Sequence, residues 1–202
     1  MAKLISNSWR YLEFAIANQF YMMVESQGID FHKILFAIQH DYPRAQHYAN
    51  SGFAAGPCLY KDTKQLSSFY KNHFSLGQSA MLVNEGLADF VVDQLESKIG
   101  ALKNKKIAIF GMTFKADSDD VRESLSFKIK KILESKMVIV LCVDPYLEKT
   151  EPIAKALEIA DGLILGVPHR EFFNLVPRKP FVDCWGIWSE NNSKVNFSHK
   201  EC

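Results

Sequence analysis

The first half of the chain carries apolar residues at helical spacing. No glycine or proline occurs between Ala2 and Val24, where apolar side chains recur every three or four residues, at Ile5, Trp9, Leu12, Ile16 and Phe20. This pattern predicts a long helix that stops near Gly28, and a shorter helix is predicted over 31–40, ahead of Pro43. Residues 41–61 contain two prolines and two glycines and predict a loop.

Helical spacing returns after that loop. It starts at Asp62 and continues to about Gly100, with possible interruptions at Gly77 and Gly86. Asp62 and Gln65 stand three residues apart, which is the spacing of a capping box, so we expect the helix to begin at Asp62.

The second half has the pattern of buried strands. Short apolar runs occupy 105–110 (KKIAIF), 137–143 (MVIVLCV) and 162–167 (GLILGV), and a fourth begins at 180–182. Helical candidates lie between them, at about 122–135 and 150–160. Apolar strands that alternate with helices predict a parallel sheet covered on both faces. The fold class is therefore α/β: an all-helical domain over 1–101, then a Rossmann-like parallel-sheet domain over 102–202.

Composition narrows the possible partners. The chain has 202 residues, 48% of them hydrophobic, which indicates a folded protein. Its 24 Lys and Arg nearly balance 23 Asp and Glu, so charge gives no reason to expect nucleic acid or an anionic membrane as partner. None of the 10 glycines forms a G-x-G pair, and the usual dinucleotide fingerprint is therefore absent.

Cysteine usage and the start of the chain suggest a compartment. The four cysteines are scattered and form no C-x-x-C pair, so neither a disulfide framework nor a metal site is predicted. No apolar run approaches the roughly 20 residues of a membrane span, and the first residues soon turn polar, unlike a signal peptide. We expect a reduced, cytoplasmic protein.

Cys58 is the first candidate for chemistry. It follows Gly56 and Pro57, just before the expected helix start at Asp62. Helix N-termini stabilise thiolates, and Lys61 adds positive charge nearby, which favours a nucleophile. The alternative is a small buried hydrophobic residue, as lone cysteines often are. Asp62 has the equally plain interpretation of a helix N-cap.

Four further residues are candidates because of their positions in the sequence. Lys3 and Asn7 are four residues apart and share one helix face beside the apolar stripe, although a solvated lysine and a surface amide fit the same spacing. Lys115 follows the first strand, where open parallel sheets bind ligands, or it belongs to a solvated turn. His169 either contacts a substrate or caps a turn.

Several segments together resemble one enzyme family. They are KLISN (3–7), GPCLYKDTKQL (56–66), IFGMTFKADSDDVRES (109–124), VDPY (143–146), ADGLILGVPHREF (160–172) and FVDCWGIW (181–188). In sequence and order these segments resemble the nucleotide-sugar 6-dehydrogenases, which include the UDP-glucose, UDP-N-acetylhexosamine and GDP-mannose dehydrogenases. The resemblance extends over essentially the whole chain.

This resemblance implies a reaction. Family members use NAD to oxidise the C6 alcohol of the sugar to a carboxylate, through a thiohemiacetal and a thioester on a cysteine. Matched by motif, Cys58 is that nucleophile, and Lys3 and Asn7 stabilise negative charge on oxygen. Asp62 matches an acidic residue that positions or activates water.

The resemblance also implies ligand contacts. Phe114 and Lys115 match positions that hold the nucleotide-sugar, and Arg44 matches an arginine that reaches the substrate of a partner subunit. A loop that covers the substrate corresponds to Asn50, Gly52, Phe53 and Gly56. Lys61 and Arg122 match positions that contact the NAD cofactor. A UDP-sugar is favoured over a GDP-sugar, and the first helix matches a homodimer interface.

Two departures from the family affect the expected activity and the expected substrate. Family members have roughly 400 residues, in two or three domains. This chain matches their carboxy-terminal portion without the NAD-binding domain, so we expect no turnover by the chain alone. Trp185 stands where an arginine is common, which makes the sugar harder to infer. The alternative is a non-catalytic nucleotide-sugar-binding or dimerisation module.

Overall fold

The computed structural model describes residues 1–188 of the 202-residue chain. The chain divides into two compact units, Met1–Phe90 and Val91–Cys202. The division falls inside helix α4 (Ser75–Ile99). The boundary expected at 101/102 stays a prediction, and the end of the second expected domain lies outside the described residues.

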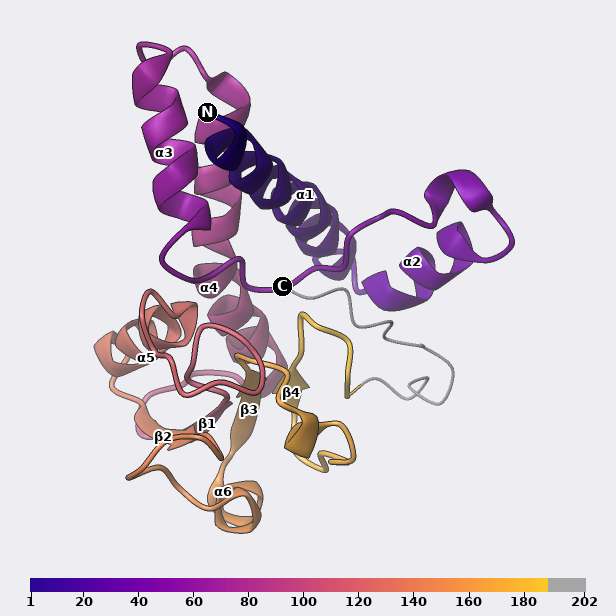
Figure 1. Ribbon diagram of the computed structural model, residues 1–202. Helices are drawn as coiled ribbons and strands as arrows, with labels where there is room; N and C mark the ends of the chain where they lie inside the picture. Colours follow the sequence, from indigo (N-terminus) through magenta and orange to yellow (C-terminus); the bar gives the residue numbers. More distant parts are fainter. Residues whose placement is uncertain (189–202) are drawn as a thin grey trace. The chain divides into compact units, whose positions relative to one another are not determined.

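The first unit is helical (Figure 1). Helix α1 (Ala2–Glu25) and helix α2 (Phe31–Gln39) occupy the two stretches where the sequence predicts helices. Asp30 caps α2, because its carboxylate accepts hydrogen bonds from the backbone N–H groups of His32 and Lys33. A short 3-10 helix, η1 (Pro43–Ala45), then precedes α3 (Leu59–Phe69) and α4.

The expected start of α3 is wrong. The helix begins at Leu59 with Cys58 as its N-cap residue, so Asp62 lies inside the first turn and forms no capping box with Gln65. The pattern misled because the carboxylate of Asp62 bonds to another helix, and no local spacing can show such a contact. The loop predicted over 41–61 also contains η1.

The break between α3 and α4 lies at 70–74 rather than at a glycine. Lys71 and Asn72 have left-handed backbone angles, with φ of 50° and 59°, which end α3. Gly77 lies within α4, where an added Cβ would come within 2.5 Å of the Phe74 ring. This glycine therefore makes room for an aromatic ring and does not interrupt the helix.

Helix α1 has two apolar faces. One is buried inside the first unit and includes Tyr11, Ala15 and Tyr21. The other lies on the surface of this chain and carries Ile5, Trp9, Ile16, Phe20 and Met23, whose exposed fractions run from 46% to 63%. Much of the apolar stripe that predicts α1 is therefore not covered by this chain.

The second unit contains a parallel sheet, as the sequence predicts (Figure 1). Its strands are β1 (Lys106–Phe110), β2 (Ile139–Val143), β3 (Gly162–Leu165) and β4 (Phe181–Val182), in the order β2-β1-β3-β4. Helix α5 (Leu125–Ser135) connects β1 to β2, and α6 (Ile153–Ile159) connects β2 to β3. These elements confirm the α/β fold class and its Rossmann-like sheet.

Both faces of the sheet are buried. One face packs an apolar core that includes Ala108, Phe110, Leu163, Leu165 and Trp188. On the other face Ile107 and Ile109 are fully buried, and Gly162 lies so close to Leu95 of α4 that an added Cβ would be 3.1 Å from it. Among residues 1–188, no helix combines the length and the apolar character needed to cross a membrane.

Candidate active site

Asp62 is the centre of a polar cluster in the first unit. Its Oδ2 accepts a hydrogen bond from Asn7 Nδ2 at 2.6 Å and lies 3.2 Å from Lys3 Nζ. The side chain of Asp62 is 1% exposed, whereas that of Lys3 is 66% exposed. The four-residue spacing of Lys3 and Asn7 places both on the face of α1 that meets α3, which is the shared face expected from the sequence.

The carboxylate of Asp62 is held in its ionised form. The hydrogen bond from Asn7 lowers the pKa of Asp62, and the ammonium of Lys3 lowers it further. Burial acts in the opposite direction and is outweighed. A buried anion therefore fixes a cation and an amide at the start of α1.

Cys58 stands one helical turn before Asp62. Its backbone carbonyl accepts the N–H of Asp62 at 2.8 Å, which closes the first turn of α3. The side chain of Cys58 is exposed, so the alternative of a buried hydrophobic cysteine is wrong.

The glycine-containing loop before Cys58 is pinned by a residue that sequence reasoning missed. Asn18 Oδ1 accepts the N–H of Gly52 at 2.8 Å, and Asn18 Nδ2 donates to the Gly52 carbonyl at 2.9 Å. The same Nδ2 donates to Asn84 Oδ1, also at 2.9 Å. Asn18 is fully buried. Its position in the sequence could have predicted this, because Asn18 follows Tyr11 and Ala15 at helical spacing and buried amides need hydrogen-bond partners.

The remaining members of this loop differ in exposure. Gly52, Phe53 and Gly56 are buried, whereas Asn50 lies at the surface. Phe53 is only 4% exposed, so in this conformation its ring packs inside the first unit. The groups that the loop can offer a ligand are therefore backbone groups and the Asn50 side chain.

In the second unit, two expected ligand residues share the loop between β1 and α5. Phe114 is half-buried and Lys115 is exposed, with its ammonium 5.7 Å from the Phe114 ring centroid. Arg122, on the same loop, donates from Nε and Nη2 to the carboxylate of Asp120. That hydrogen bonding lowers the pKa of Asp120 to about 2, so Arg122 already has a carboxylate partner.

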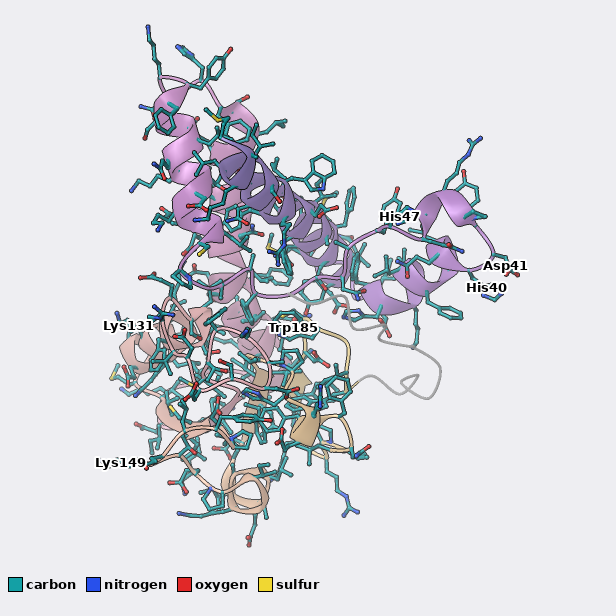
Figure 2. All side chains as sticks on the ribbon, in the orientation of Figure 1. His40, Asp41, His47, Lys131, Lys149 and Trp185 are labelled. Carbon is teal, nitrogen blue, oxygen red and sulfur yellow. The ribbon has the colours of Figure 1, made fainter. Side chains whose placement is uncertain are left out.

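Two other expected residues are exposed cations of the first unit. Lys61 of α3 directly precedes Asp62, and its charge helps to lower the pKa of that carboxylate, whereas Arg44 belongs to η1. His40 and Asp41 precede η1 and His47 follows it, and all three are labelled in Figure 2. Among residues 1–188, no group of three or more His, Cys, Asp and Glu side chains is placed to hold a metal ion.

Trp185 follows β4 and is labelled in Figure 2. Its indole Nε1 donates to the Gly166 carbonyl at 3.0 Å. Since an indole has a single N–H, this bond uses the one donor that Trp185 has. The side chain can therefore offer a ligand its apolar surface only.

The fold and the Asp62 cluster define an α/β protein in which a cation, an amide and a carboxylate meet one helical turn from an exposed cysteine. Residues 1–86 match the central domain of the UDP-glucose/GDP-mannose dehydrogenase family, and residues 108–190 match the UDP binding domain of the same family. The chain belongs to this family.

Known members are similar over most of this chain. A UDP-N-acetyl-D-mannosamine dehydrogenase of Pyrococcus horikoshii is 28% identical over 177 residues, which are 85% of this chain and 42% of the relative. A UDP-glucose 6-dehydrogenase of Rickettsia felis is 31% identical over 193 residues, 87% of this chain and 43% of the relative. The chain spans about half the length of the curated relatives it matches.

A solved structure shares the fold. The UDP-glucose dehydrogenase of the hyperthermophilic archaeon Pyrobaculum islandicum superimposes with a TM-score of 0.82. It is 24% identical, and the match covers 95% of this chain and 48% of that one.

Proposed function

We propose that this chain is the central and nucleotide-sugar-binding part of an NAD-dependent nucleotide-sugar 6-dehydrogenase. One observation carries the proposal: Lys3 and Asn7 converge on the buried Asp62, one helical turn from the exposed thiol of Cys58. In the overall reaction, the C6 alcohol and one water become a carboxylate. Two molecules of NAD, when bound, accept the two hydrides, and the protons pass to solvent.

Cys58 supplies the covalent chemistry. Its sulfur adds to the carbon of the C6 aldehyde, and the aldehyde oxygen becomes the hydroxyl of a thiohemiacetal. Loss of a hydride from that carbon, which NAD would accept when bound, together with loss of the hydroxyl proton to solvent, leaves a thioester. Water then adds to the thioester carbon, the C–S bond breaks, and the thiol returns with the proton that water gives up.

Lys3 and Asn7 stabilise the oxygen that gains negative charge in these steps. An ammonium has three hydrogens and an amide nitrogen has two, so bonding to Asp62 leaves each group a donor for the substrate oxygen. Asp62 is ionised and a weak base, because its pKa is lowered by Asn7 and Lys3. This favours a carboxylate that orients the two donors and a nearby water over one that removes a proton.

The residues expected to contact NAD fit only part of that molecule. Lys61 and Arg122 are exposed cations, which suit phosphate oxygens. The sequence has no G-x-G pair to cradle a pyrophosphate. We therefore propose that this chain adds contacts to NAD without providing the main dinucleotide-binding unit, and that it gives no normal turnover alone.

For the sugar nucleotide, we propose a UDP-sugar in preference to a GDP-sugar. The relatives described above are named for UDP-sugars, and the matched domain is described as UDP binding. Phe114, Lys115 and the loop from Asn50 to Gly56 would hold it, and Arg44 would reach the substrate of a partner subunit. The free thiols of Cys58, Cys142 and Cys184 suit the reduced, cytoplasmic location that we propose.

We also propose a homodimer formed through the exposed apolar face of α1. A helix face that carries Trp9, Ile16 and Phe20 in contact with water is a typical interface surface. Replacing Ile16 and Phe20 by glutamate is expected to halve the mass measured by light scattering, with the helical circular dichroism unchanged. A wild-type chain that is already a monomer at micromolar concentration would argue against this dimer.

Ligand binding and thiol labelling test the proposed function. Calorimetric titration of the wild-type chain with UDP- and GDP-sugars is expected to show binding of a UDP-sugar, and a bound UDP-sugar is expected to slow alkylation of Cys58. The Cys58→Ser variant identifies the labelled site. Absence of binding together with an unreactive Cys58 would favour a purely structural module, whereas normal NADH production would refute the inactivity of the isolated chain.

A further inference from the structure

Two buried side chains meet where the strands of the second unit end. Asp144 follows β2 directly, and His169 comes shortly after β3, as the residue before the short 3-10 helix η2 (Arg170–Phe172). Both side chains are 0% exposed, and His169 Nε2 lies 3.1 Å from Asp144 Oδ2. Because the His169 side chain is buried, it does not contact a substrate directly, and its role depends on the groups to which it is hydrogen-bonded.

The surrounding backbone assigns the proton of the imidazole. The N–H of Asp117 donates to His169 Nδ1 at 3.0 Å, so Nδ1 carries a lone pair. In a neutral imidazole the proton is then on Nε2, which donates it to Asp144. His169 therefore needs one donor and one acceptor on opposite sides of its ring, and both are supplied.

Asp144 is bonded on both carboxylate oxygens. Oδ2 accepts the backbone N–H groups of Met112, at 2.6 Å, and Thr113, at 3.3 Å. Oδ1 accepts the N–H of Tyr146 at 2.9 Å. Burial alone would raise the pKa of Asp144, but the hydrogen bonds from His169, Met112 and Tyr146 outweigh it and lower the pKa.

These bonds fix one particular loop. Asp144 holds it at residues 112 and 113, and His169 holds it at residue 117, so the two anchors lie on either side of Phe114 and Lys115. Thr113 Oγ1 adds a bond to the Lys115 carbonyl at 2.9 Å. The two expected ligand residues are therefore carried on a segment whose backbone is tied down at both ends.

A second layer supports the histidine from outside. The Tyr146 ring lies 4.9 Å from the His169 ring, and its hydroxyl bonds to Glu171 at 3.1 Å and to Asp117 at 3.4 Å. Arg170 Nε pairs with Asp117 Oδ2 at 2.8 Å. Burial and the neighbouring carboxylates raise the pKa of Tyr146 to about 12, so its hydroxyl stays protonated and able to donate.

We propose that Asp144 and His169 are positioning residues that hold the loop over 112–117 in the conformation presenting Phe114 and Lys115 to the nucleotide-sugar. The inference rests on the proposed function for the identity of the ligand. The clamp itself rests on the hydrogen bonds alone. Because the pair is buried, it acts on the ligand only through the loop.

Substitutions at His169 separate the two bonds. His169→Phe keeps a ring against Tyr146 and Phe172 but loses the polar contacts to Asp144, Asp117 and Thr113 Oγ1. His169→Gln can retain the donor to Asp144, and His169→Asn can retain the acceptor for Asp117. Lys131→Gln, an exposed change on α5 of the same unit (Figure 2), is the matched control.

Two measurements on the full chain test the clamp. Amide hydrogen exchange of 112–121, compared with exchange in the strands, is expected to rise on the order of tenfold in His169→Phe, because the buried polar contacts of the imidazole are lost. The dissociation constant for a UDP-sugar, measured below the melting temperature, is expected to rise by a similar factor. The Gln and Asn variants are expected to recover part of the exchange protection and part of the UDP-sugar affinity. Lys131→Gln is expected to change neither quantity.

Three results would overturn the proposal in distinguishable ways. Unchanged UDP-sugar affinity in His169→Phe, with a lower melting temperature, would show a purely structural role. Exchange that rises uniformly through the sheet would show that the pair does not hold this loop in particular. If the wild type binds no nucleotide-sugar, the proposed function fails and the ligand part falls with it, while loop-specific exchange would still support the clamp. If His169→Phe does not fold, the Gln and Asn variants provide the same comparison.

Discussion

Replacing Asn18 by alanine should strongly destabilise the first unit. The change removes three hydrogen bonds inside the unit, two to the backbone of Gly52 and one to Asn84. It leaves the Gly52 N–H, the Gly52 carbonyl and Asn84 Oδ1 without their partner, and all belong to buried residues.

The size of the effect follows from those three groups. A buried polar group that loses its partner costs roughly 1–3 kcal/mol, so the three groups together should lower the free energy of unfolding by about 3–9 kcal/mol in Asn18→Ala, with the lower end if water enters. Native domains are stable by only about 5–15 kcal/mol, so such a loss is readily measured.

Urea unfolding followed by circular dichroism at 222 nm is the suitable assay, because the first unit is helical. In a Trp9→Phe background, which removes the one tryptophan of the first unit, the fluorescence of Trp185 and Trp188 reports the second unit in parallel and should change less. Gln19→Ala, at the exposed neighbouring position, is the control and should stay within about 0.5 kcal/mol of wild type. If Asn18→Ala matches this control, the amide network contributes little and the burial of Phe53 holds the loop instead.

Three other outcomes can be predicted from the structure. Because hydrogen bonds, chiefly from the amide on α1, lower the pKa of Asp62 in the folded state, its contribution to stability is present above the unfolded pKa of about 4 and is lost as pH falls through the lower folded value. The stability advantage of wild type over Asp62→Ala should therefore shrink in urea titrations below pH 4. Gly111→Ala should destabilise the sheet by about 3 kcal/mol or more, since φ is +89° and the new Cβ would meet Val167 at 2.6 Å. A thiol reagent should label exposed Cys58 within minutes and Cys184 only after unfolding, because Cys184 is buried and burial raises its pKa.

Each of these has its own control. A stability difference for Asp62→Ala that is the same at pH 7 and pH 3 would contradict the ionised, hydrogen-bonded carboxylate. Gly100→Ala also has a positive φ but open space around it, so it should cost only about 1 kcal/mol, and an equal loss at both glycines would contradict the steric argument. Peptide mapping identifies the labelled cysteine, and equal labelling rates for Cys58 and Cys184 in native protein would contradict the burial of Cys184.

The sequence predicts most of the architecture because apolar periodicity depends on local spacing. The runs that become β1, β2 and β3 are apolar except for Lys106 at the start of β1, which suits strands of a parallel sheet with a buried centre. The pairing of Lys3 with Asn7 on one helix face also follows from spacing alone.

What the sequence could not predict are contacts between residues far apart in the chain. The start of α3 was predicted wrongly because an aspartate near a helix start has the sequence pattern of an N-cap. The sequence does not show that this carboxylate binds side chains of α1 instead. Asn18 was missed since an amide within an apolar stripe looks like a surface position until its partner, 34 residues away, is known. The tautomer of His169 likewise depends on a backbone N–H in another loop.

The continuity of α4 has a practical consequence for dissecting this protein. The boundary between the two compact units falls after Phe90, yet the helix runs from Ser75 to Ile99. Asn84 completes the amide network of the first unit, and Leu95 lies against Gly162 in the sheet of the second. A gene cut at the boundary would leave both halves with a severed helix. Pieces meant to fold separately would have to overlap, each retaining the whole of α4.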